Sequence, residues 1–165
     1  MKYIISTLLT LAIVVGIAST VQAKRGSDGQ LNLVYWQAPS TMNPNLSGGT
    51  KELEASSVVL EPLGRYDETG NLLPWLAEEI PTVSNGGISK DLTTITWKIK
   101  KGIKWSDGSA LTADDAVFTY EYCSNPDTGC TQSNYWVDIK SVTAVNSVTV
   151  KVEFTVPKPF PYAPF

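Results

Sequence analysis

The chain contains the stretch Ile99-Lys-Lys-Gly-Ile-Lys-Trp-Ser-Asp-Gly-Ser-Ala-Leu-Thr-Ala-Asp-Asp-Ala-Val-Phe-Thr-Tyr120, and its other predicted elements are organised around it. Ile95, Trp97 and Ile99 alternate with polar residues, which is the period of a half-buried strand. Gly102 and the dipeptide Asp107-Gly108 then mark two tight turns. The stretch therefore predicts a strand, a turn, a short strand and a second turn.

A helix is predicted to follow these turns. Thr112 stands three residues before Asp115 and just ahead of an apolar run, which is the spacing of a capping box. One face of the predicted helix carries Ala113, Ala116, Val117 and Tyr120. Nothing in the stretch resembles an activated nucleophile, so we interpret it as scaffold.

Composition excludes several classes of function. The 165 residues suit one domain with a sizeable core, and the net charge of −3 comes with scattered basic residues, so the sequence carries no nucleic-acid footprint. The chain has no histidine, which removes Ser-His-Asp and Cys-His catalysis and most transition-metal sites. We therefore predict no metal, no cofactor and no nucleic-acid partner.

Residues 1–23 have the pattern of a secretory signal peptide. Lys2 gives a positive start, residues 4–18 form an apolar core, and Val21 and Ala23 place small residues before the cleavage point. An uncleaved membrane anchor is the alternative, but the apolar run is shorter than the roughly 20 residues that a spanning helix needs. No cysteine follows the cleavage region, so a lipid-modified N-terminus is not supported. We expect the mature chain to begin at residue 24 and to be secreted.

Export changes the interpretation of the two cysteines. Cys123 and Cys130 are separated by six residues, and in an oxidising compartment we expect them to form a disulfide across a loop. Closing so short a loop stabilises the fold by about 2 kcal/mol in the chain-entropy model. A redox pair and half of a metal site are the alternatives, but the spacing does not fit C-x-x-C and partner ligands are lacking.

Further elements are predicted on the N-terminal side. The apolar residues 31–36 indicate a buried strand, as in a parallel sheet covered on both faces, and the loop at 37–41 follows its carboxyl end. Ligands of open α/β sheets bind beyond such ends, although a plain connecting loop fits the same residues. The remaining predictions are a helix at 50–60, a hairpin at 66–72 turned by residues 67–71, and a helical turn at 74–78.

The C-terminal residues predict one more hairpin and a tail. Val148, Val150, Val152 and Phe154 alternate with polar residues, and Asn146-Ser147 forms the turn of a hairpin over residues 141–154. The proline-rich residues 156–165 are expected to be extended, with aromatic side chains that have nothing to pack against.

Three ordered blocks resemble one known family. They are similar to blocks of the extracytoplasmic solute-binding proteins of family 5, the dipeptide- and oligopeptide-binding type of ABC importers. The blocks are Ser40-Thr-Met-Asn-Pro44 after the first predicted strand, Leu60 to Glu78 ending in Pro-Trp-Leu-Ala-Glu, and Trp97 to Phe118. The hairpin at 142–154 and Pro157–Phe160 fit the segment that follows. The resemblance covers most of the mature chain.

The resemblance implies a fold and a function. The fold is α/β and periplasmic-binding-protein-like, of type II with two lobes around a cleft, and this chain holds only part of the first lobe, with a mixed sheet and hairpins. Members run to several hundred residues, so we expect residues 24–165 to be the incomplete N-terminal part of the domain. The implied function is to capture peptides and deliver them to an ABC permease with its cytoplasmic ATPase. Some relatives bind nickel chelates, haem or oligosaccharides instead.

The resemblance also implies ligand contacts. The family's ligand-contacting loop after the first strand corresponds to Gln37, Ala38, Pro39 and Ser40. An aromatic residue that follows the helix predicted after Thr112 corresponds to Tyr135 or Trp136. Aromatic residues packed beneath a loop are the alternative for the last two. The family's aspartate for the peptide amino terminus belongs to the second lobe and has no counterpart here.

Two other classes of function compete with this interpretation. A secreted hydrolase would need a carboxylate pair such as Asp114 with Asp115 or Glu78 with Glu79. Adjacent helical residues point about 100° apart, so neither pair would face across a substrate, and Asp114 and Asp115 are better explained as first-turn acids that suit the helix dipole. A small self-sufficient secreted interaction domain is the third possibility, and it requires the chain to fold as a monomer on its own.

Overall fold

A computed structural model describes residue 29 and residues 32–163. The predicted signal peptide at 1–23 lies outside the described residues. The chain divides into two units, residues 1–36 and residues 37–165. The first unit contains five consecutive described residues, and the second contains the elements below.

A three-stranded antiparallel sheet carries the core of the second unit. Its strands are β3 (Thr94–Lys98), β5 (Thr149–Phe154) and β4 (Ile139–Asn146), with β5 in the centre. The predicted alternation is confirmed, because Ile95 and Trp97 lie opposite Val152 and Val150 and all four side chains are buried. Fully burying an aliphatic side chain stabilises a fold by about 1.5–3 kcal/mol, so this face is the main source of stability. The described sheets are wholly antiparallel, and the parallel pairing of the expected mixed sheet does not occur among residues 32–163.

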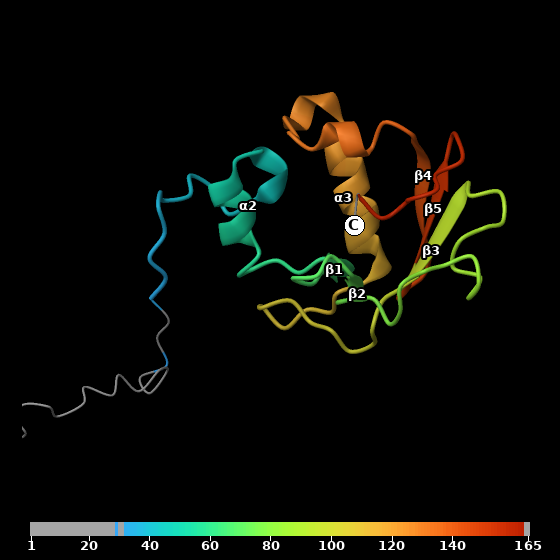
Figure 1. The fold of residues 1–165 in the computed structure, drawn as a ribbon, viewed down its shortest axis with the longest axis horizontal. Coiled ribbons are helices and arrows are strands. Elements are labelled where there is room, and N and C mark those ends of the chain that lie inside the picture. Colours follow the sequence, from blue (N-terminus) through green and yellow to red (C-terminus); the bar gives the residue numbers. More distant parts are fainter. Residues whose placement is uncertain (1–28, 30–31, 164–165) are drawn as a thin grey trace, which may run out of the picture. The chain divides into compact units, whose positions relative to one another are not determined.

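The apolar face of the sheet packs against helix α3 (Ala113–Ser124), which lies beside β4 and β5 (Figure 1). The predicted capping box is confirmed, with the Thr112 backbone N–H donating to Asp115 Oδ2 over 2.7 Å. Ala113 is fully buried, and Ala116, Val117 and Tyr120 pack against the core as predicted. Gly102 and Gly108 both adopt positive φ, at 79° and 89°, which confirms the two turns before the helix.

A short hairpin precedes the sheet. Strands β1 (Gly64–Tyr66) and β2 (Leu72–Pro74) pair around the predicted turn, where Asp67 accepts hydrogen bonds from Thr69 and Asn71. The helical turn predicted at 74–78 is wrong. Ala77 instead forms an isolated antiparallel bridge with Ile99, in which the Glu78 N–H donates to the Lys98 carbonyl over 2.7 Å and the Lys100 N–H to the Leu76 carbonyl over 2.9 Å. Pairing with the end of β3 satisfies more backbone groups than one isolated turn of helix would.

The strand predicted at 31–36 is also wrong for its described part. Residues 32–36 form no strand, and Leu33, Val34 and Trp36 are exposed. A strand exists only where a neighbour supplies hydrogen bonds, and the described strands β3, β4 and β5 pair with one another. An apolar β-rich composition therefore does not by itself produce a strand here.

The C-terminal residues pack, contrary to expectation. Pro161 is buried, the Tyr162 ring meets the Trp97 ring edge-on with centroids 6.0 Å apart, and the Tyr162 hydroxyl donates to the Pro81 carbonyl over 2.8 Å. The Lys158 N–H also donates to the Leu92 carbonyl. The tail thus packs against Trp97 of strand β3 and against the loop that contains Pro81.

The remaining short helices are α2 (Thr50–Ser56), η1 (Pro44–Leu46), η2 (Pro126–Thr128) and η3 (Ser133–Tyr135). The predicted helix at 50–60 is confirmed for its first two turns and ends in turns at 57–59. The predicted disulfide between Cys123 and Cys130 is present. None of the helices within residues 32–163 has the length and apolar character needed to cross a bilayer.

Candidate functional site

The candidate ligand loop, residues Gln37–Ser40, opens the second unit and is exposed at every position. A buried carboxylate of α2 holds its last residue. Glu52 Oε1 accepts hydrogen bonds from the backbone N–H of Ser40 over 3.0 Å and from the Ser40 hydroxyl over 2.7 Å. The loop is therefore fixed at its end while its own surface faces solvent.

Lys51 completes this contact. Its Nζ lies 2.9 Å from Glu52 Oε1, and it donates to the Ala38 carbonyl over 3.1 Å and to the Ser40 hydroxyl over 3.2 Å. The Glu52 side chain is 2% exposed, so its charge is compensated at close range instead of by water. Hydrogen bonds from Lys51 and from Ser40 lower the pKa of Glu52 from 4.5 to about 2.

Gly49 makes room for this buried carboxylate. A Cβ at residue 49 would lie 2.5 Å from Glu52 Oε2, closer than side chains approach one another. Sequence reasoning missed Glu52 and Lys51, because the polar pattern of residues 50–54 reads as an exposed helix face. The pairing of Gly49 with an acid three residues later is the one local signal.

The structure places the two candidate aromatic residues differently. Tyr135 ends η3 and is 49% exposed, whereas Trp136 is 5% exposed and lies in the core, with its ring centroid 6.0 Å from that of Tyr120. Of the two, Tyr135 presents a ring that a ligand can reach. Among the described residues, no hydrogen bond or ring contact brings Tyr135 together with Gln37–Ser40.

The carboxylate pairs have other partners. Asp115 caps α3, and its neighbour Asp114 is exposed. Glu78 is exposed and its backbone N–H donates to the Lys98 carbonyl, while Glu79 accepts a hydrogen bond from Asn85 and lies 3.6 Å from Lys98 Nζ. Within residues 32–163, side chains of His, Cys, Asp and Glu do not gather into a group of three that would hold a metal ion.

Comparison with known proteins assigns the chain to a family. Residues 71–165 match the family described as bacterial extracellular solute-binding proteins, family 5. The chain belongs to this family. It is 38% identical over 130 residues to a probable ABC transporter-binding protein of Deinococcus radiodurans, which covers 76% of this chain and 21% of that protein.

Two solved family structures share the fold. Haemophilus influenzae OppA in complex with RPPGFSPFR matches 75% of this chain and 26% of its own, with a TM-score of 0.67 and 26% identity. Campylobacter jejuni NikZ in complex with Ni(L-His) matches 78% of this chain and 24% of its own, with a TM-score of 0.66 and 28% identity. The α/β type II binding-protein fold predicted from the three sequence blocks is confirmed. The chain spans about a quarter of the length of these relatives.

Proposed function

We propose that this chain contributes the first lobe of an extracytoplasmic binding protein that captures peptides for an ABC importer. The observation that carries the proposal is its likeness, over three quarters of its length, to an OppA whose bound ligand is a peptide of nine residues. Residues 24–165 form the N-terminal part of the family 5 domain in this proposal, and residues 1–23 direct export to the periplasm. The partners are the permease subunits and their ATPase.

The residues that contact ligand are Gln37, Ala38, Pro39, Ser40 and Tyr135. The loop 37–40 is exposed and fixed at Ser40 by Glu52, so its remaining backbone groups are available at a defined position. Backbone hydrogen bonds to an extended peptide give affinity without selecting its side chains. An exposed aromatic ring such as Tyr135 supplies apolar contact that tolerates varied side chains.

The function requires no catalysis. Members of family 5 are described as binding proteins, and Asp115, one of the acids that a hydrolase would need, caps a helix. Binding a flexible peptide in a cleft between two lobes and then closing over it buries the ligand and changes the surface that meets the permease. The second lobe supplies the other side of that cleft in this account.

A metal chelate is the alternative ligand, because the bound ligand of NikZ is Ni(L-His). Identifying the ligand that the purified protein carries decides between a peptide and a metal chelate. The mature protein, produced from its complete gene in its native host and purified without denaturant, is denatured in acid, and the released small molecules are identified by mass spectrometry. We expect a mixture of short peptides at about one per protein. Nickel with a small organic chelator, and no peptide, would contradict the peptide assignment and leave the family membership intact.

A further inference from the structure

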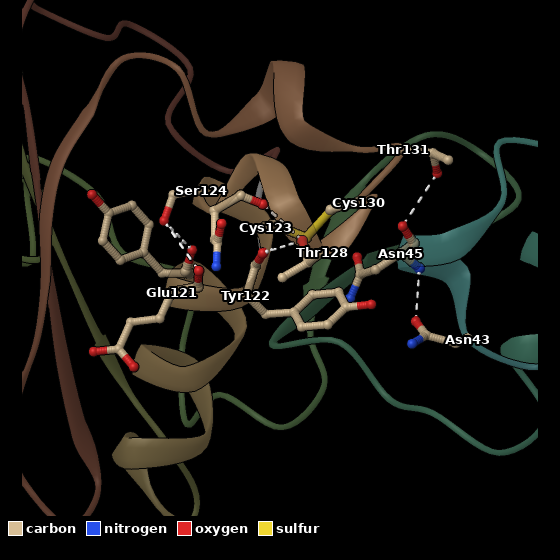
Figure 2. The surroundings of a disulfide bond; sticks show 11 residues. Asn43, Asn45, Glu121, Tyr122, Cys123, Ser124, Thr128, Cys130 and Thr131 are labelled. Atoms are coloured by element: carbon tan, nitrogen blue, oxygen red, sulfur yellow. Dashed lines mark hydrogen bonds between the residues drawn. A yellow bond between two sulfur atoms is a disulfide. The ribbon is translucent and has the colours of Figure 1, made fainter.

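The disulfide closes a loop at the end of α3. Cys123 lies in the last turn of the helix and Cys130 follows η2, and the two residues are 1% and 8% exposed. Inside the loop, the Thr128 hydroxyl donates to the Tyr122 carbonyl over 2.7 Å. The loop is thus fixed both covalently and by hydrogen bonds to the helix (Figure 2).

The residue after the disulfide contacts the segment beside the candidate ligand loop. The Thr131 backbone N–H donates to the Asn45 carbonyl over 2.8 Å, and the Thr131 hydroxyl donates to the same oxygen over 3.3 Å. This contact joins residues 86 positions apart in the chain. Figure 2 shows Thr131 directed at Asn45 from the side of the disulfide.

Asn45 is held from its other side as well. Its backbone N–H donates to the Asn43 side chain over 2.9 Å, and the Asn43 N–H donates to the Thr41 hydroxyl over 3.1 Å. A continuous series of hydrogen bonds therefore runs from Thr131 to Thr41. Thr41 directly follows Ser40, the last residue of the candidate ligand loop.

We infer that the disulfide Cys123–Cys130 positions the candidate ligand loop through Thr131. The disulfide limits the movement of Cys130 and hence of the Thr131 amide, which holds η1 at Asn45. Without the disulfide, the Thr131 amide moves with a free loop of six residues, and residues 37–47 lose a fixed support. The positioning of residues 37–47 stands on the contacts above, and its consequence for ligand affinity rests on the proposed function.

Hydrogen exchange of the ligand-free protein tests the positioning. The double variant Cys123→Ala/Cys130→Ala, made in the complete gene, is expected to exchange the hydrogen-bonded amides within residues 37–47 about tenfold faster than the wild type at neutral pH; these are the amides of Ser40, Asn43, Asn45 and Leu46. The control Val152→Ala destabilises the central strand β5 without touching this series of bonds. We expect it to leave exchange at 37–47 unchanged. Faster exchange confined to residues 123–131 in the double variant would overturn the inference.

A second pair of variants keeps the disulfide and changes only the contact. Thr131→Pro removes the amide donor, whereas Thr131→Val keeps it and loses the weaker hydroxyl bond. Fast exchange at 37–47 in the first variant and near-wild-type exchange in the second are expected. Equal exchange in both variants would contradict a role for the amide.

Peptide affinity separates this inference from the proposed function. We expect the double variant to bind peptide several-fold more weakly than the wild type. Faster exchange at 37–47 with unchanged peptide affinity would support the positioning and count against Gln37–Ser40 as ligand contacts.

Discussion

At the scale of single residues, Glu52 is the group on which the candidate ligand loop depends. Its pKa of about 2 in the folded protein lies below the ordinary value of 4.5. A depressed carboxyl pKa contributes stability that is fully present above pH 4.5 and is lost as the pH falls toward 2. We expect Glu52→Gln to unfold at lower urea concentration at pH 7 and to lose less stability than the wild type between pH 4.5 and 2.

The matched control is Glu54→Gln, an exposed acid on the same helix. It is expected to leave both the urea midpoint at pH 7 and the pH dependence close to those of the wild type. Asp67, whose pKa is also about 2 because Asn71 and Thr69 donate hydrogen bonds to it, titrates in the same window in every variant. If the free energy of unfolding depends on pH identically in Glu52→Gln and in the wild type, the Glu52 carboxylate is not stabilised in its charged form by Lys51 and Ser40.

Tyr162 tests the packing of the C-terminal residues at the same scale. Its hydroxyl donates to the Pro81 carbonyl, and burial raises its pKa. Tyr162→Phe keeps the ring against Trp97 and removes this one bond, so we expect a loss of about 1 kcal/mol in the free energy of unfolding. An unchanged urea midpoint would indicate that the Tyr162 hydroxyl makes no stabilising hydrogen bond to the Pro81 carbonyl in solution.

At the scale of elements, the cap of α3 gives the sharpest prediction. Asp115→Ala removes the acceptor for the Thr112 N–H and is expected to lower the free energy of unfolding by about 1 kcal/mol. Asp114→Ala removes an exposed neighbour in the same first turn and is expected to cost only a few tenths of a kcal/mol. Equal losses, measured by urea unfolding, would mean that dipole effects and not the cap stabilise the helix start.

Elements with local signals were predictable from sequence. The strand at 94–98, the capped helix and the two hairpins each carry their periodicity or turn residues within a short stretch. The strand predicted at 31–36 failed because none of the described strands pairs with residues 32–36, and the helical turn at 74–78 failed because its backbone partner is distant in sequence. Ala77 pairs with Ile99, and the sequence near residue 77 does not predict that pairing. The Thr131–Asn45 contact was missed for the same reason, because it joins residues 86 positions apart, and the only local signal for Glu52 is Gly49 three residues before it.

At the scale of the whole molecule, three ordered sequence blocks predicted the family, and both the family match and the solved relatives confirm it. The proposed ligand contacts were predicted from the resemblance, as the loop after the first predicted strand and an aromatic residue at 135 or 136. Which of these two aromatic side chains is exposed depends on tertiary packing, because Trp136 is buried in the core whereas Tyr135 is exposed.

Isothermal titration of the mature protein, produced from its complete gene and freed of bound ligand, shows whether it binds peptides. The titrants are the nonapeptide RPPGFSPFR, a set of di- to hexapeptides, and Ni(L-His) as the competing ligand. We predict saturable one-to-one binding of at least one peptide with a Kd of about 10 μM or tighter, and no saturable binding of the nickel chelate. Saturable binding of Ni(L-His) with no heat from any peptide would contradict the proposal that the protein captures peptides.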